Sequence, residues 1–408
     1  MTPLMRMTVL GLLPGFVLGA FVVVWWVDVP YLDQWELVPL LAAWEGGTLR
    51  WADIWAQHNE HRLVFPKLLM LATAALTDWD VRYEMAASLL LAFVCYGLVA
   101  LFLHRARAPR YTPVLAGLLV FSPSQWGNWF LGWQVQIFLM LVALLIVLAL
   151  LPRPGGPGFA GAIAAAIVAS FSFGSGLLVW PVGLLAIAWA RPPRRATRLA
   201  LWTLAGGGTI AAYLWGYARV GYHPEPAPLA ATLGRAGYAL AYLGSPLSQQ
   251  VWLAMPLGGA ALAALTYATL RMDRNRHAAL LALGWFGVGT ALLTAWVRAG
   301  YGLEQALSSR YVTLANLAWL GALPALGSLR GTRRHAAAGV LATLLLLQAF
   351  WGAYTWTLRY PAYAEARAAL LADGNPESLT VLYPDADVLH TRRAQLEARG
   401  LSVFRDPP

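Results

Sequence analysis

The run QVQIFLMLVALLIVLALL, residues 134–151, contains no charged side chain. It is close to the ~20 apolar residues that a helix needs to cross ~30 Å of hydrocarbon. Similar runs recur along the chain, whose 408 residues are 59% apolar and only 12% charged. A water-soluble core cannot hide so much apolar surface. The sequence therefore predicts an all-α polytopic membrane protein.

The apolar runs predict about 11 transmembrane helices. They lie at residues 7–27, 86–103, 111–122, 134–151, 158–172, 176–190, 199–218, 251–270, 278–297, 311–328 and 336–357. Three of the runs are shorter than the hydrocarbon layer and have to extend, tilt or be partly re-entrant. The first run has no small-residue cleavage site, so we interpret it as a retained helix and not as a signal peptide.

Arginines gather in the loops on the side of the N-terminus. These loops hold one acid, Asp273, and the arginines at positions 6, 105, 107, 110, 153, 191, 194, 195, 198, 271, 274, 276, 330, 333 and 334. Short arginine-rich loops stay in the cytoplasm. We therefore expect the N-terminus inside and the C-terminus outside. The 28 arginines against one lysine, with abundant alanine, are typical of a GC-rich bacterial genome, so we place the protein in a bacterial cytoplasmic membrane. The net charge of +10 reflects this topology and does not indicate a nucleic-acid partner.

The first outer loop, residues 28–85, collects nine of the chain's nineteen acids. Asp28, Asp33 and Glu36 open it. The apolar residues of 37–44 recur at helical spacing and predict a short amphipathic helix on the membrane surface, starting near Glu36. Residues 63–77 predict a second surface or re-entrant helix, because another crossing would move every later arginine cluster outside.

The six residues QHNEHR at positions 57–62 can all ionise or hydrogen-bond. Glu60, His61 and Arg62 are candidates for substrate binding, although Arg62 could equally anchor to lipid headgroups. His58 and His61, with Asp33, are candidate metal ligands. The HExxH order of a metalloprotease is absent, and interface histidines without a metal are common.

A second outer patch, residues 122–134, places three tryptophans among amides and glycines. Flat aromatic faces beside hydrogen-bonding amides suit a sugar ring, so Gln125, Trp126 and Asn128 are candidate sugar contacts. The alternative is the aromatic belt that membrane proteins carry at headgroup depth.

A third outer patch, residues 298–311, has an arginine near each end. Arg298 and Arg310 suit a phosphate, which guanidinium groups bind bidentately. Tyr301 and Tyr311 accompany them as candidate substrate contacts. For Arg298 the alternative is snorkelling from a helix end.

The last 51 residues, 358–408, follow the final apolar run on the outer side. They predict a small α/β cap of helix (362–372), strand (Leu379–Tyr383), helix (386–399) and a final strand at 401–404. So small a unit is marginally stable alone, so we expect it to dock on the outer loops of the bundle formed by residues 1–357.

The layout resembles the GT-C superfamily of membrane glycosyltransferases, on three features. These are the bundle with its N-terminus inside, the long acidic first outer loop with two surface helices, and the acid soon after the first span, in Asp28…Asp33-Gln-Trp-Glu36. The runs His58–Arg62 and Ser309–Tyr311 are also similar to those of bacterial membrane proteins near this superfamily. The resemblance implies a polyprenyl-phosphate sugar as donor, an acceptor that is a glycan, lipid or protein, and an active face outside the cytoplasm amid membrane lipids.

The resemblance also implies residue roles. Asp33 is expected to be the general base, or a ligand where a divalent cation such as Mg²⁺ or Mn²⁺ is used, with Asp28 as second choice. Glu36, Glu60 and His61 would orient acceptor or metal. Arg298 and Arg310 would hold the lipid phosphate, with Gln125, Trp126 and Asn128 near the sugar. Two alternatives stay open: a flippase for lipid-linked sugars, and an accessory membrane subunit without chemistry.

Overall fold

The computed structural model describes residues 3–153, 155–221, 232–372 and 379–405. Within these ranges the chain is helical and contains no β-strand. The one strand-like feature there is an isolated backbone bridge between His58 and His61. The expected helical fold class is therefore confirmed over the described ranges.

The eleven predicted runs are built mostly of helix. In chain order they correspond to α1 (Pro3–Leu10) with α2 (Leu13–Trp25), α6 (Arg82–Ala106), α7 (Thr112–Val120), α9 (Val135–Leu150), α10 (Gly156–Ser170), α11 (Val179–Ala190), α12 (Arg195–Leu214), α14 (Val251–Arg271), α15 (Arg274–Arg298), α16 (Ser309–Ala322) and α17 (Gly331–Leu371). The helix α13 (Thr232–Gly244) was not predicted, because its glycines, tyrosines and arginine form no apolar run. The short helices α4 (Trp51–Trp55) and α8 (Trp126–Trp129) were not predicted either.

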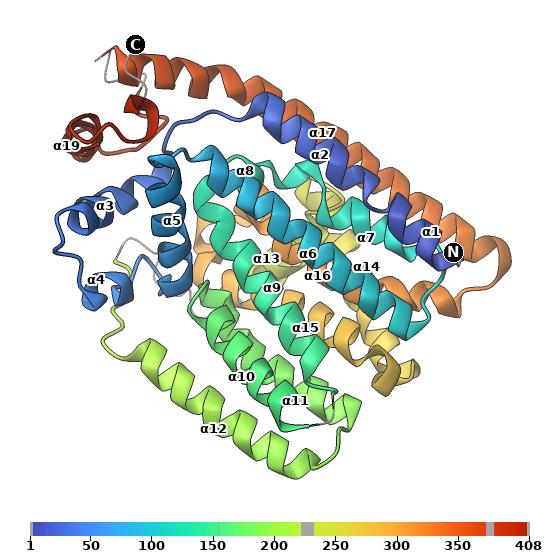
Figure 1. The fold of residues 1–408 in the computed structure, drawn as a ribbon. Helices are drawn as coiled ribbons and strands as arrows, with labels where there is room; N and C mark the ends of the chain where they lie inside the picture. Colours follow the sequence, from blue (N-terminus) through green and yellow to red (C-terminus); the bar gives the residue numbers. More distant parts are fainter. Residues whose placement is uncertain (1–2, 154, 222–231, 373–378, 406–408) are drawn as a thin grey trace.

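Six helical stretches of the described chain could cross a membrane by length and composition. They are Leu4–Trp25, Arg82–Ala106, Gly132–Leu150, Val251–Arg271, Arg274–Tyr301 and Gly331–Leu371. The others are too short or too polar for that test, so a count of 11 crossings stays a prediction. The spans around α9 and α15 are the most buried and form the centre of the bundle, whereas α17 and α12 lie at opposite edges (Figure 1).

The first outer loop folds at one end of the bundle (Figure 1). It contains the 3-10 helix η1 (Leu32–Leu37) and the helices α3 (Val38–Glu45), α4 (Trp51–Trp55) and α5 (Val64–Thr77). Both expected helices of this loop are present. α3 starts at Val38 because Pro39 fits only the first turn of a helix, and it ends at the Gly46–Gly47 pair.

The C-terminal segment differs from the prediction in two ways. α17 continues as one helix of 41 residues through Pro361 to Leu371, where a break near 357 was expected. A proline removes one helical hydrogen bond, and the residues around it are mostly good helix formers, so the helix persists. The predicted strand Leu379–Tyr383 is also wrong, because it forms a turn, and residues 402–404 form the 3-10 helix η9 (Ser402–Phe404).

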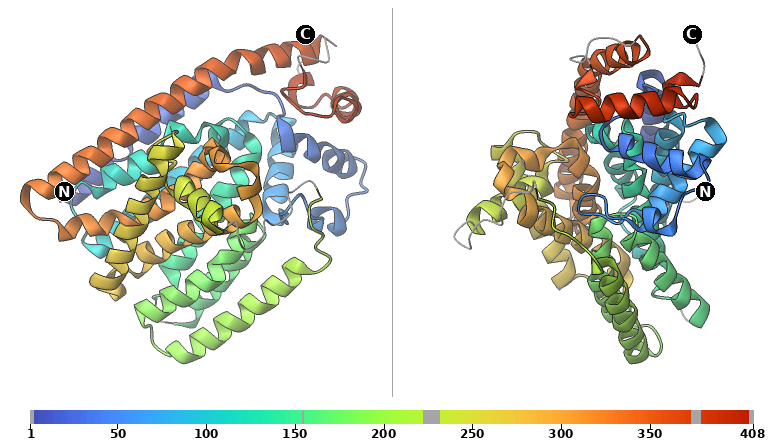
Figure 2. Two further views of the ribbon diagram at one scale, coloured as in Figure 1. Left: turned by 180° about the vertical axis from the view of Figure 1, so that it is seen from behind. Right: turned by 90° about the vertical axis from the view of Figure 1, so that its left-hand side faces the viewer.

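Two buried leucines explain that turn. Leu379 and Leu382 point inward, and the Leu382 carbonyl accepts a hydrogen bond from the Leu32 N–H of η1 at 2.7 Å. No described strand lies beside this apolar run to pair with it, so it folds onto η1 instead. Docking on the outer loop is thereby confirmed: the segment, with α19 (Ala386–Glu397), lies beside residues 28–77 in Figures 1 and 2.

Candidate active site

A tight turn at His58–His61 presents the polar residues of the first outer loop. The two residues exchange backbone N–H···O hydrogen bonds of 2.8 Å in both directions. Asn59 has a φ of +48°, in the left-handed region that asparagine tolerates better than most residues. The Gln57 side chain ties the turn to the chain after α12, because it bonds both the N–H and the carbonyl of Ala218.

His61 is locked in one orientation against the turn after α10. The Gly174 N–H donates to His61 Nδ1 at 3.0 Å, and the ring stacks on Phe173 with centroids 4.4 Å apart. Because a backbone N–H can only donate, the proton of the neutral ring is on Nε2. A Cβ at Gly174 would lie 2.7 Å from Nδ1, so this approach requires glycine. Burial lowers the pKa of His61 to about 4, which makes it neutral at pH 7.

Glu60 forms an ion pair with Arg298 at the end of α15. Burial alone would raise the pKa of Glu60, but His61 and Arg298 together lower it to about 2. Because His61 is neutral at pH 7, Arg298 is the cation that keeps Glu60 ionised there. The charge of Arg298 is therefore already compensated, and Arg298 is less available to a phosphate than we expected.

Asp33 lies on η1 beside the same turn, with its Oδ1 3.7 Å from His58 Nε2. Its neighbour Gln34 is buried and donates to Glu84 Oε2 at 2.7 Å, which fixes η1 on the start of α6. Burial opposes ionisation of Asp33, but His58 and Arg310 outweigh it and hold its pKa below the ordinary value. Asp33 is thus a carboxylate at neutral pH.

These residues line one cavity of about 510 Å³, which we call the Asp33 cavity. Six of the residues singled out from the sequence meet there: Asp33, Glu60, His61, Arg298, Arg310 and Tyr311. They come from η1, the 58–61 turn, the end of α15 and the start of α16. The opposite wall is largely apolar and includes Ile137, Leu177, Leu214, Leu293, Val297 and Leu314.

Arg310 stands in the first turn of α16, which the second outer patch holds in place. Asn128 donates to the Arg310 carbonyl at 3.0 Å and to Thr313 Oγ1 at 2.7 Å. A Cβ at Gly127 would lie 2.6 Å from Ser309 Oγ, so glycine there lets α8 (Trp126–Trp129) approach α16 closely. The Arg310 guanidinium makes no hydrogen bond or ion pair with any described residue.

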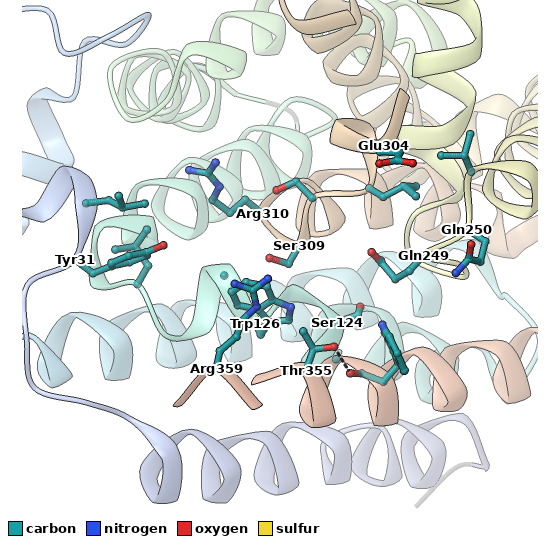
Figure 3. Close-up of a pocket in the computed structure, with 18 of the residues that line it drawn as sticks. Tyr31, Ser124, Trp126, Gln249, Gln250, Glu304, Ser309, Arg310, Thr355 and Arg359 are labelled. Carbon is teal, nitrogen blue, oxygen red and sulfur yellow. Dashed lines mark hydrogen bonds between the residues drawn. The ribbon is translucent and has the colours of Figure 1, made fainter. Parts of the chain in front are cut away.

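A second cavity of about 640 Å³, the Trp126 cavity, also has Arg310 in its lining (Figure 3). Its polar lining includes Tyr31, Ser124, Trp126, Gln249, Gln250, Glu304, Ser309, Arg310, Thr355 and Arg359. Arg310 belongs to both cavities, so it forms part of the wall between them.

Several predicted site residues have other partners. Gln125 is buried and donates to the carbonyls of Leu119 and Val120 at 3.0 Å, and Asn128 braces α16 as described. Of the three candidate sugar contacts, Trp126 alone lines either the Asp33 cavity or the Trp126 cavity.

Arg62 is also buried, where it donates to three backbone carbonyls, those of Tyr213, Trp55 and Trp215. It holds the loop to α12 and faces neither cavity. Tyr301 is 47% exposed and lies outside both cavities.

Asp28 and Glu36 anchor the C-terminal segment. Asp28 is buried with its Oδ2 2.5 Å from Arg405 Nη1. Glu36 accepts two hydrogen bonds from Arg392, at 2.8 and 2.9 Å, and one from the Tyr383 hydroxyl at 2.6 Å. Neither carboxylate lines the Asp33 cavity, so Asp33 is the one acid of the opening stretch that does.

Sequence reasoning missed several residues of these sites. Glu84 accepts a hydrogen bond from Gln34 and so holds η1 on α6. Arg359, Gln249 and Gln250 line the Trp126 cavity. The sequence held weak signals that could have identified three of them as site residues. Gln249 and Gln250 directly precede one apolar run, and Arg359 follows the end of another.

The donor atoms near Asp33 do not fit a divalent cation. His61 Nδ1 is engaged by the Gly174 N–H, and Glu60 is paired with Arg298. Across the described ranges, no group of three His, Cys, Asp or Glu residues is placed to hold a metal ion.

Two solved structures of ArnT from Cupriavidus metallidurans resemble this chain. The structure bound to undecaprenyl phosphate has a TM-score of 0.45 and 14% identity, and the match covers 98% of this chain and 77% of ArnT. The apo structure has a TM-score of 0.47 and 16% identity, with 94% and 76% covered.

No protein-family model matches the sequence, and no curated protein matches it.

Proposed function

We propose that the protein is a membrane glycosyltransferase that moves a sugar from a polyprenyl-phosphate donor to an acceptor on the extracytoplasmic face of the cytoplasmic membrane. One observation carries the proposal: the Asp33 carboxylate and the Arg310 guanidinium, which lacks an ion-pair partner in the described chain, line the same cavity. Transfer of a sugar from a phosphate needs a base for the acceptor and a cation for the leaving group.

In the proposed reaction, an acceptor hydroxyl attacks the anomeric carbon while the bond between that carbon and the phosphate oxygen breaks. The hydroxyl proton passes to Asp33, and the phosphate leaves on its lipid with the bonding electrons. The lowered pKa of Asp33 makes it a weak base. We therefore infer that the bond to the leaving group breaks ahead of proton transfer. Stabilisation of the departing phosphate by Arg310 then lowers the activation barrier more than proton transfer to Asp33 does.

Neighbouring residues would orient the acceptor. The His61 Nε2 atom lies 3.8 Å from Glu60 Oε1, and its N–H can donate to a hydroxyl of the substrate. The Glu60–Arg298 pair forms one wall of the cavity without adding net charge. No step of this mechanism passes through a metal ion.

The alternatives predict different arrangements. An accessory subunit has no need for Asp33, Glu60 and Arg310 to meet, whereas they line one cavity here. A flippase would bind a lipid-linked sugar without consuming it, which a turnover measurement distinguishes.

The test is turnover of radiolabelled polyprenyl-phosphate sugars by purified protein in lipid nanodiscs, with a panel of acceptors. We expect wild type to consume the lipid-linked label and Asp33→Asn to be slower by about 10²–10⁴-fold, with lipid binding unchanged. Asp53→Asn is the matched control, because Asp53 belongs to the same loop and caps α4, where asparagine can still accept the Arg50 N–H. Binding without consumption would contradict the transferase, and full activity of Asp33→Asn would contradict the assigned base.

A further inference from the structure

The Trp126 cavity has a strongly cationic end. Arg310 and Arg359 both line it, and the Arg359 guanidinium lies over the Trp126 ring, 4.7 Å from its centroid. Neither arginine forms an ion pair within the described chain. In Figure 3 both lie at one end of the cavity, and the carboxylate of Glu304 lies at the other.

This separation of charge fixes where an anion would bind. Two guanidinium groups that form no ion pair with the described residues favour a phosphate, because their planar N–H groups match its oxygens. Glu304 would repel an anion from the far end. A phosphate is therefore expected between Arg310 and Arg359.

The mouth of the same cavity lies in the membrane-facing surface. Trp252 of α14 is 73% exposed and Trp351 of α17 is 51% exposed, and both line the cavity. Both helices are candidate membrane spans, so large apolar side chains exposed on them face lipid. α14 packs on α13 and α16, whereas α17 packs on α7 and residues 123–125, which leaves the mouth between them. Tryptophan is also the residue typical of headgroup depth.

We infer that the Trp126 cavity is the donor side of the proposed transferase, so this inference rests on the proposed function. It binds the phosphate of a polyprenyl-phosphate sugar between Arg310 and Arg359, and the prenyl chain leaves between α14 and α17. The sugar then points past Arg310 towards Asp33, and the Asp33 cavity receives the acceptor. This arrangement puts the cations at the leaving phosphate and the base at the attacking hydroxyl.

The inference is tested with a photoreactive prenyl monophosphate that carries a diazirine on its chain. It is irradiated with the purified full-length protein in nanodiscs, and the labelled peptides are identified by mass spectrometry. We expect labels on α14 and α17 beside the mouth, at least tenfold fewer in Arg359→Gln, and partial recovery in Arg359→Lys, which keeps the charge. Arg330→Gln is the matched control, because Arg330 precedes the opposite end of α17.

Three results would overturn the inference: labels confined to α12 and α15 around the Asp33 cavity, labelling that is insensitive to Arg359→Gln in a folded variant, or equal labelling by the prenol without phosphate. The outcome is separable from that of the proposed function. Labels at the mouth without sugar consumption would retain the phosphate site and reject the transferase. Consumption with labels on α12 and α15 would do the reverse.

Discussion

Glu60 in the first outer loop and Arg298 at the end of α15 form an ion pair in the wall of the Asp33 cavity, although 238 positions separate them in the chain. The pair joins a loop outside the bundle to one of its central helices. The pair also compensates the charge of Arg298, one of the two arginines that we predicted to bind a phosphate. Arg310 is therefore the better candidate for that role.

Removing either partner of this pair should destabilise the protein. Glu60→Gln removes the carboxylate of this ion pair and Arg298→Gln removes its cation, and we expect each single variant to lose about 1–3 kcal/mol of unfolding free energy. Because both side chains are mostly buried, the double variant Glu60→Gln/Arg298→Gln should lose less than the sum of the two single losses. Thermal unfolding of all four proteins measures this coupling, and strict additivity would show that the pair contributes nothing.

Stability should fall as the pH is lowered from 7 towards 4. Unfolded His61 binds its proton near pH 6.5 and folded His61 only near pH 4, so between these values the unfolded state holds more protons and acid favours it. The loss from this residue is about 2–3 kcal/mol at ~1.36 kcal/mol per unit of pKa. Below that window, Glu60 adds a further loss, because its pKa of about 2 is also below the unfolded value.

The measurement is the unfolding midpoint between pH 7 and pH 4.5 for wild type, His61→Gln and His390→Gln. The His61 variant should show a flatter dependence, and the variant of the exposed His390 should follow wild type. Identical slopes for all three proteins would refute the assignment to His61.

Chelation should leave turnover intact. Because the donors around Asp33 are already engaged by Gly174 and Arg298, we expect activity after EDTA treatment to stay within about twofold of the untreated rate. Added Mg²⁺ or Mn²⁺ should not raise it. Loss with EDTA that Mn²⁺ restores would mean that the cavity rearranges to bind a cation.

Two arginines of the C-terminal segment should differ sharply in their contribution. Arg405 pairs with buried Asp28 and Asp80. Because Asp80 keeps its ion pair with Arg82, Arg405→Gln removes the paired cation of buried Asp28 alone, and we expect a cost of about 3–5 kcal/mol. Arg399 pairs with the exposed Glu45, and Arg399→Gln should cost at most about 1 kcal/mol. Limited proteolysis of residues 379–405 and thermal unfolding compare the two, and equal effects would contradict the burial argument.

Local sequence patterns predicted the helices well where one physical effect dominates. The run at 134–151 becomes α9 because apolar residues of that length have no other stable state in a membrane. Pro39 in the first turn and Gly46 after the last turn set the two ends of α3, and both effects act locally in the chain. The strand at Leu379–Tyr383 failed because strands need partners, and which segments become neighbours is not encoded locally.

The site residues also divide into those that local sequence predicts and those that depend on tertiary contacts. The sequence indicated that polar residues gather on the outer side, and six of them do line one cavity. It did not indicate that Arg62 donates to a carbonyl in the last turn of α12, or that Glu36 forms an ion pair with Arg392, because those partners lie more than 150 residues away. Residue type predicts which chemistry is possible, and only the tertiary contacts determine which groups remain available for it.

α17 extends from Gly331 to Leu371 without interruption, which is roughly 60 Å of helix at ~1.5 Å per residue, about twice the hydrocarbon thickness. Its last turn accepts a hydrogen bond from Arg393 of α19 through the Leu370 carbonyl. The boundary at 357 that the sequence suggested between bundle and cap therefore falls inside a helix. A truncation there would remove Arg359 from the wall of the Trp126 cavity together with the partners of Glu36 and Asp28, so the outer segment and the bundle have to be made, studied and engineered as one piece.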